Sequence, residues 1–187
     1  MATGAIAISD YRYLNNSKRV QFIFRHFSNL CEYIEGYEKS LCDLLMAERT
    51  MTKQKARDEL GVRVQTSGHS DPTAREAVER VDIMDKIQSG DDEISNEVMK
   101  CEGGEELIID IEILHQMRRD YDFVVHAMRV LPAHERNDLE AVLEHEKEIA
   151  GLADEKGILI ESARMQIYRS KKKVRMEAVR FMERIGA

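Results

Sequence analysis

Basic side chains near the C-terminal end of the chain have the type and spacing that point most directly to a chemistry. From Ala163 onward, eight Lys and Arg residues stand against two Glu residues, a charge of +6 in a chain whose net charge is −7. Guanidinium and ammonium groups gathered on one element bind nucleic-acid phosphates, and an acidic body with one basic element favours a DNA-binding protein. A solvated basic helix face accounts for the charge equally well.

The remaining reactive side chains form no arrangement typical of an enzyme or a metal centre. The six His residues are scattered without zinc-ligand spacing, and the acidic runs Asp91 to Glu93 and Glu102 to Glu106 lack a calcium-loop pattern. No glycine-rich loop precedes a basic residue, and Ser, Cys and His form no recognisable nucleophile arrangement. We therefore expect no enzyme activity, no cofactor and no metal ion.

The composition predicts an all-α protein of one moderate domain or two small ones. The 187 residues include no Trp and two Pro, with 34% charged residues, which favours helices over a sandwich or barrel. No apolar run is long enough to span a bilayer, and Met1 to Ser9 lacks the basic flank of a signal peptide. Three cysteines without metal-type spacing are expected to be reduced thiols, so we expect a cytoplasmic protein without a membrane partner.

A wide apolar stripe predicts one long amphipathic helix from Asn16 to about Lys55. Apolar residues fill both core positions of four heptads: Val20, Ile23, Phe27, Leu30, Ile34, Tyr37, Leu41 and Leu44. The flanking positions Phe24, Cys31 and Leu45 are apolar too, whereas a two-stranded coiled coil prefers charge there. We expect this helix either to pack into a bundle or to form a broad homodimer interface.

Two further helices are expected in the middle of the chain. Gly61 to Pro72 is a turn-rich link in which Asp71 caps the next helix, and that helix ends near Ser89 and Gly90. Its expected apolar face consists of Ala74, Val78, Val81 and Met84. Asp91 and Asp92 are expected in a connection. The next helix starts between Ile94 and Glu105 and reaches Leu131, with Gly103 and Gly104 dividing it into a short and a long piece.

From Leu131 onward the sequence predicts a helix-turn-helix. Leu131-Pro132 interrupts the preceding helix, and Pro132 starts one that carries Leu139, Val142 and Leu143. A short helix follows at Ile149 to Lys156, Gly157 ends it, and the last helix begins near Ile160 or Glu161. Small Ala153 lets the two helices cross closely. In such a motif the second helix lies in the DNA major groove.

Spaced positions in this region resemble the −35-element-reading region of sigma factors. The matching residues, in register without a gap, are Leu131, Pro132, Leu139, Leu152, Ala153, Gly157, Ile158, Ala163, Ile167, Arg169, Ser170 and Val174. The Val64 to Gly68 and Asp71 to Ala74 segments resemble small phage sigma-like regulators of the RinA-like and ArpU-like groups, which control late genes and packaging. One residue and one segment depart from the sigma pattern. Leu159 replaces a capping hydroxyl residue, and Glu144 to Glu148 is strongly polar.

By position, the resemblance assigns roles to eight residues. Those facing DNA bases would be Ile160, Glu161, Arg164 and Met165, and those facing phosphates would be Arg169, Lys171, Lys172 and Lys173. Arg164 is the main candidate because arginine can bond guanine through two hydrogen bonds. Glu161 could accept from a cytosine amino group, or act only as a helix cap.

Together these patterns predict three segments and one function. Residues 1–62 form an N-terminal helical, oligomerising segment, residues 63–130 a linker and helical body, and residues 131–187 the sigma-like DNA-binding domain. The resemblance implies a sequence-specific regulator of phage or prophage transcription in a bacterial host cell, with double-stranded DNA and RNA polymerase as partners. Two alternatives stay open: a sigma-like module that binds polymerase or another regulator instead of DNA, and a DNA-packaging recognition subunit.

Overall fold

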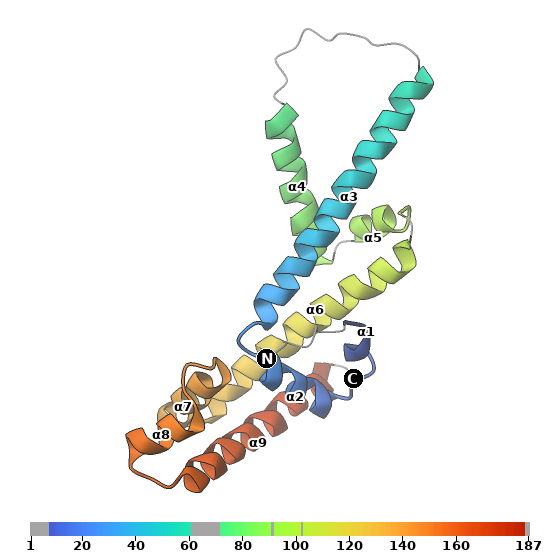
Figure 1. Ribbon diagram of the computed structural model, residues 1–187. Helices are drawn as coiled ribbons and strands as arrows, with labels where there is room; N and C mark the ends of the chain where they lie inside the picture. Colours follow the sequence, from blue (N-terminus) through green and yellow to red (C-terminus); the bar gives the residue numbers. More distant parts are fainter. Residues whose placement is uncertain (1–7, 61–71, 91, 102, 186–187) are drawn as a thin grey trace. The chain divides into compact units, whose positions relative to one another are not determined.

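The computed structural model describes residues 8–60, 72–90, 92–101 and 103–185 (Figure 1). Every regular element in these ranges is helical, which confirms the expected all-α class. Among the same residues, no helix is both long and apolar enough to cross a membrane. Contacts divide the chain into two compact units, a terminal unit of Met1–Tyr33 with Gln116–Ala187 and a central unit of Ile34–His115. This division differs from the three expected segments, because the N-terminal helices pack with the C-terminal ones.

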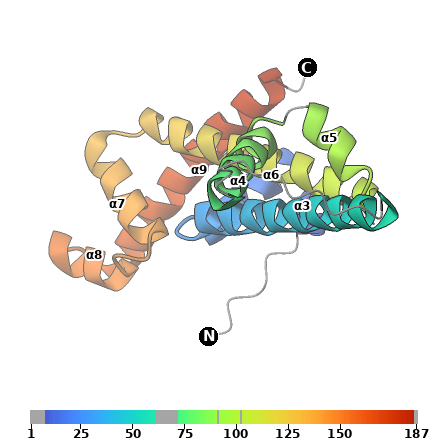
Figure 2. The same ribbon diagram turned by 90° about the horizontal axis from the view of Figure 1, so that it is seen from above.

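The terminal unit is a bundle arranged around its last helix. Helix α9 contacts α2, α7, α8 and the short 3-10 helix η1, and both views show α7, α8 and the start of α9 grouped together (Figure 1 and Figure 2). The elements of this unit are α1 (Ile8–Tyr11), α2 (Asn16–His26), the start of α3 (Leu30–Leu60), the second half of α6 (Gly104–Ala127), η1 (Met128–Val130), α7 (Ala133–Leu143), α8 (Ile149–Lys156) and α9 (Ile160–Ile185).

The single long helix expected from Asn16 to Lys55 is wrong, since a turn separates α2 from α3. The Asn29 amide donates to the His26 carbonyl oxygen at 3.1 Å, a turn contact rather than a helical one. Ser and Asn at positions 28 and 29 favour such a break because their side chains compete for backbone hydrogen bonds. Most of the heptad stripe is nevertheless buried within the chain: Val20, Ile23, Phe27, Leu30, Ile34 and Leu41. That burial removes the main sequence argument for a homodimer through this stripe.

One buried polar contact joins α1 to α6 in the terminal unit. The Tyr11 hydroxyl donates to Asp120 Oδ2 at 2.7 Å, and both residues are buried. Arg19 lies 4.0 Å from the same carboxylate, and its guanidinium stands 5.7 Å from the centre of the Tyr11 ring. Burial raises the pKa of both Tyr11 and Asp120. The contact satisfies two polar groups that would be costly to bury alone.

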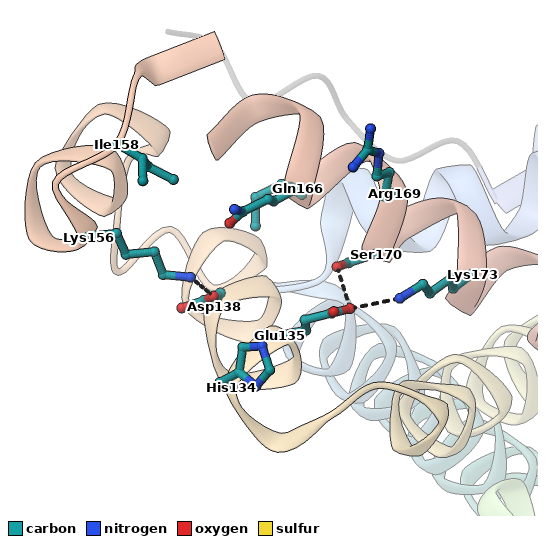
Figure 3. Close-up of a pocket in the computed structure, with 10 residues that line it drawn as sticks. His134, Glu135, Asp138, Lys156, Ile158, Gln166, Arg169, Ser170 and Lys173 are labelled. Atoms are coloured by element: carbon teal, nitrogen blue, oxygen red, sulfur yellow. Dashed lines mark hydrogen bonds and ion pairs between the residues drawn. The ribbon is translucent and has the colours of Figure 1, made fainter. Parts of the chain in front are cut away.

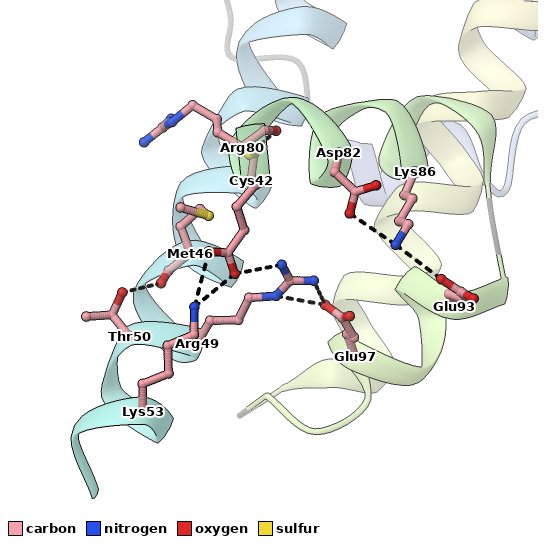
Figure 4. A network of polar contacts seen from close by, with 11 residues as sticks. Cys42, Met46, Arg49, Thr50, Lys53, Arg80, Asp82, Lys86, Glu93 and Glu97 are labelled. Carbon is pink, nitrogen blue, oxygen red and sulfur yellow. Dashed lines mark hydrogen bonds and ion pairs between the residues drawn. The ribbon is translucent and has the colours of Figure 1, made fainter. Parts of the chain in front are cut away.

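Ion pairs join the three helices of the central unit that surround Arg49 (Figure 4). These helices are the body of α3, α4 (Pro72–Ser89) and α5 (Asp92–Val98), and the first half of α6 completes the unit. Arg49 of α3 pairs with Glu97 of α5, and its Nη1 lies 3.0 Å from Glu79 of α4. Lys53 also reaches Glu79, at 3.1 Å. Hydrogen bonds from Lys53 and Arg49 lower the pKa of Glu79.

Two expectations for the central unit require correction and one is confirmed. Asp92 begins α5 instead of lying in a connection. Helix α4 buries Ile83 and Ile87, whereas Val78 and Val81 of the expected core face are 70% and 59% exposed. The helix carries apolar residues on two sides, and the larger isoleucines form the side that packs. A break near Gly103 and Gly104 does separate α5 from α6. The expected Asp71 cap and the Val64 to Gly68 segment lie outside the described residues.

Candidate nucleic-acid interface

Helix α8, the following turn and α9 form a helical hairpin whose local geometry matches the sequence prediction. Helix α8 spans Ile149–Lys156, and Gly157 follows with a left-handed φ of 62°. The amides of Gly157 and Ile158 donate to the carbonyl oxygens of Asp154, at 3.2 Å, and of Ala153, at 3.0 Å. Glycine is favoured at such a helix end because it has no side chain to clash at positive φ. Helix α9 then begins at Ile160, as expected.

Small and apolar side chains lie inside this hairpin. Ala153 of α8 and Ala163 of α9 are both completely buried, as required where two helices approach closely. Leu152 and Ile167 are buried beside them, and Leu139 of α7 is buried within the same unit. The hairpin is therefore held by packing on one side, which fixes the face that α9 turns to solvent.

All four residues expected to face DNA bases lie on the solvent-exposed side of α9: Ile160, Glu161, Arg164 and Met165. In the described part of the chain, neither Glu161 nor Arg164 has an ion-pair partner. Glu161 lies in the first turn of α9, where a carboxylate is favoured by the helix dipole. The start of α9 thus presents one cation and one anion to solvent, and neither forms an ion pair with another described side chain.

The four residues expected to contact phosphates do not lie together. Arg169 and Lys172 are exposed, and no ion pair is seen for either among the described residues. Lys173 is exposed but its Nζ lies 3.0 Å from Glu135 of α7. Lys171 points to the α2 side, with Nζ 5.9 Å from the centre of the Phe24 ring, and burial lowers the pKa of its ammonium group. Arg169 and Lys172 are therefore the two cations of this set best placed for phosphates.

A cavity of ≈ 330 Å³ lies between α7 and α9, along the edge of this face (Figure 3). Its charged lining comes from Lys156, Arg169 and Lys173 and from two acids of α7, Glu135 and Asp138. Lys156 pairs with Asp138, and Lys173 pairs with Glu135 and lowers the pKa of that carboxyl. The α7 carboxylates thus neutralise two cations beside the exposed face. Sequence reasoning missed them, because the pairs join residues 18 and 38 positions apart.

Large apolar side chains are also exposed near the basic residues of α9. They are Leu159 just before the helix, and Ile160, Met165, Tyr168 and Met176 within it. A face that mixes apolar groups with cations can read thymine methyl groups and phosphates, but it can also hold an acidic amphipathic helix of a protein partner.

No group of three or more His, Cys, Asp or Glu that could hold a metal ion is found in the described ranges. Comparisons with protein-family models, curated proteins and solved structures find no match for this chain. The side chains of the α8–α9 hairpin therefore carry the functional argument.

Proposed function

We propose that this protein binds double-stranded DNA by placing the first half of α9 in a major groove. The observation that carries the proposal is the set of exposed cations on α9, Arg164, Arg169 and Lys172, which form no ion pair with the described residues. Cations that form no internal ion pair are available to replace the counterions of a polyanion. The buried Ala153 and Ala163 fix the direction of these cations, because they fix the packed side of the hairpin.

Within this proposal, position along α9 divides the contacts into two kinds. Arg164 and Glu161, in the first two turns, read base edges, and Arg164 donates two guanidinium hydrogen bonds to O6 and N7 of guanine. Arg169 and Lys172, further along the helix, contact phosphates and set the register of the protein on the duplex. Lys173 joins them only when it leaves Glu135. Lys171, packed against Phe24, contributes to the support of α9 rather than to DNA binding.

The sigma-like register from Leu131 to Val174 supports a role in transcription. We propose a sequence-specific regulator of phage or prophage genes that recruits RNA polymerase to the sites it binds. The chain resembles no core-binding sigma region in its N-terminal half, so recruitment fits better than action as a complete sigma factor.

Selection of bound sequences from random duplex DNA tests this proposal. The wild-type protein should enrich a motif, and the Arg164→Ala/Arg169→Ala variant should not. A matched control, Arg12→Ala/Arg25→Ala, removes two exposed arginines near α2 and should enrich the same motif as the wild type. No enrichment by the wild type, or an unchanged motif with the α9 variant, would contradict the proposal.

A second function is favoured by the exposed apolar residues of α9. Leu159, Tyr168 and Met176 would pack against a protein partner, while Arg169 and Lys172 pair with its acidic residues. RNA polymerase or another regulator is the expected class of partner. Substitution of Tyr168 and Met176 by Ser separates the two functions, because it removes apolar area and leaves the cations in place. Loss of polymerase pull-down with unchanged DNA affinity would favour the protein-binding function.

A further inference from the structure

Helix α4 carries an apolar stripe that faces solvent. Val78 and Val81 are three residues apart, so they lie on one side of the helix, one turn from each other. Ile83 follows Val81 by two residues, about 200° around the helix, and it is completely buried. The packed side of α4 also reaches α3, where the Cys42 thiol donates to the Arg80 carbonyl oxygen at 3.6 Å. The valines therefore lie on the side of α4 that faces away from its own unit.

Two opposite charges lie along one edge of this stripe. Arg75 precedes Val78 by three residues and Asp82 follows it by four, so both lie on one edge of the stripe, two turns apart. Both are exposed, and Arg75 has no ion pair among the described residues. Asp82 shares Lys86 with Glu93, each at 3.1 Å (Figure 4). A shallow hollow at Val78 is lined by Ala74, Arg75, Glu79 and Asp82.

This arrangement is complementary to itself when one copy is reversed. About a two-fold axis, an α4 helix meets a second α4 running in the opposite direction, and each contact occurs twice. Arg75 of one chain then meets Asp82 of the other, and Asp82 meets Arg75, while the two Val78 side chains pack against each other beside the axis. In a parallel pairing the two-fold axis would run along the helices and place these edges on opposite sides of the contact, so the Arg75–Asp82 pairs would not form. Electrostatic complementarity of this kind selects both the partner and its direction.

We infer that the exposed face of α4 is a self-association surface whose partner is the α4 of a second copy, in antiparallel orientation. This surface is separate from the apolar stripe of α2 and α3, which is mostly buried within the chain. It shares no residue with the α8–α9 hairpin. Self-association is measured without DNA, so the outcome does not depend on the proposed function.

Sedimentation velocity of the full-length protein, across a concentration series, measures this association directly. The wild type should form a species of twice the 21.6 kDa chain mass. Arg75→Asp and Asp82→Arg should each weaken the dimer at least roughly tenfold, because each replaces two attractions by two repulsions. Glu76→Arg is a matched control. It makes the same charge change as Asp82→Arg at an exposed position on the other side of α4, and it should leave the dimer intact.

A charge exchange separates this specific pairing from general damage to the helix. The double variant Arg75→Asp/Asp82→Arg should dimerise like the wild type, because both pairs are restored with their signs reversed. An equal mixture of the two single variants should also form dimers, since each Asp then meets an Arg. A wild type that stays monomeric at ~100 µM, or single variants that the exchange and the mixture do not rescue, would overturn the inference.

Discussion

Helices α9 and α4 each keep one face open to solvent, and the two faces differ in chemistry. On α9 the exposed charges expected to meet phosphates, Arg169 and Lys172, are both positive and form no ion pair in the described part of the chain. On α4 two valines are flanked by one positive and one negative residue, Arg75 and Asp82. Cations that form no internal ion pair suit a polyanion, whereas an apolar face with opposite charges along its edge suits a copy of itself. The pattern of charge, rather than exposure alone, indicates the class of partner.

The largest expected effect comes from removing the three unpaired cations of α9 together. Arg164→Ala/Arg169→Ala/Lys172→Ala should lower affinity for the selected duplex by roughly a thousandfold at low salt, because it removes one base contact and two phosphate contacts. Fluorescence anisotropy with labelled DNA measures this loss. The same variant should dimerise like the wild type. Loss of dimerisation in this variant would contradict separate roles for the exposed faces of α9 and α4.

Buried and exposed apolar residues of the two helical regions should respond very differently to truncation. Leu152→Ala empties a fully buried position under α9 and should cost about 2–5 kcal/mol of unfolding free energy. Val78→Ala, on the exposed side of α4, should change it by at most about 0.5 kcal/mol when the protein is dilute and monomeric. Urea denaturation measures both. If both variants lost a similar amount of unfolding free energy, Val78 would have to be covered by residues of its own chain.

A polar exchange on α4 should affect association while leaving the fold unchanged. Val78→Ser/Val81→Ser removes the apolar area of the stripe without adding charge, so we expect roughly tenfold weaker dimerisation. The circular dichroism spectrum should not change, because both positions face solvent. Analytical ultracentrifugation gives the dissociation constant, and an unchanged value would remove the valines from the interface.

The smallest expected effect concerns the acid that holds Lys173. Glu135→Gln removes the carboxylate 3.0 Å from Lys173 Nζ and frees that cation, so DNA affinity should rise about two- to threefold. The hydrogen bond from Lys173 lowers the pKa of the Glu135 carboxyl below 4.5. In the wild type the ion pair is therefore present at pH 7 and is lost only as the pH falls through the lowered pKa of Glu135. Glu140→Gln, which removes another α7 carboxylate paired within its own helix, is the control. Titrations at pH 7 compare the two.

Local chemistry in the sequence was enough to locate the α8–α9 hairpin. Gly157 could end a helix in a left-handed conformation and Pro132 could begin one, so the start of α7, the end of α8 and the start of α9 followed from neighbouring residues alone. The burial of Ala153 and Ala163 followed from their small size at the expected crossing.

Features that depend on distant parts of the chain could not be predicted in the same way. The heptad pattern continues through the turn after His26, because α2 and α3 both bury apolar residues although they belong largely to different units. Periodicity also could not tell which apolar side of α4 would pack. Lys171 and Lys172 are adjacent in the sequence, yet only the position of Phe24 shows that the first is turned away from solvent.

Salt dependence of binding to the selected duplex tests the central claim, that α9 binds DNA, most directly. The logarithm of the wild-type affinity should fall linearly with the logarithm of salt concentration. Lys172→Ala should reduce that slope by about 0.9, the loss of one phosphate contact. A flat salt dependence, or the same slope with and without Lys172, would contradict the account and assign the basic face of α9 to a protein partner.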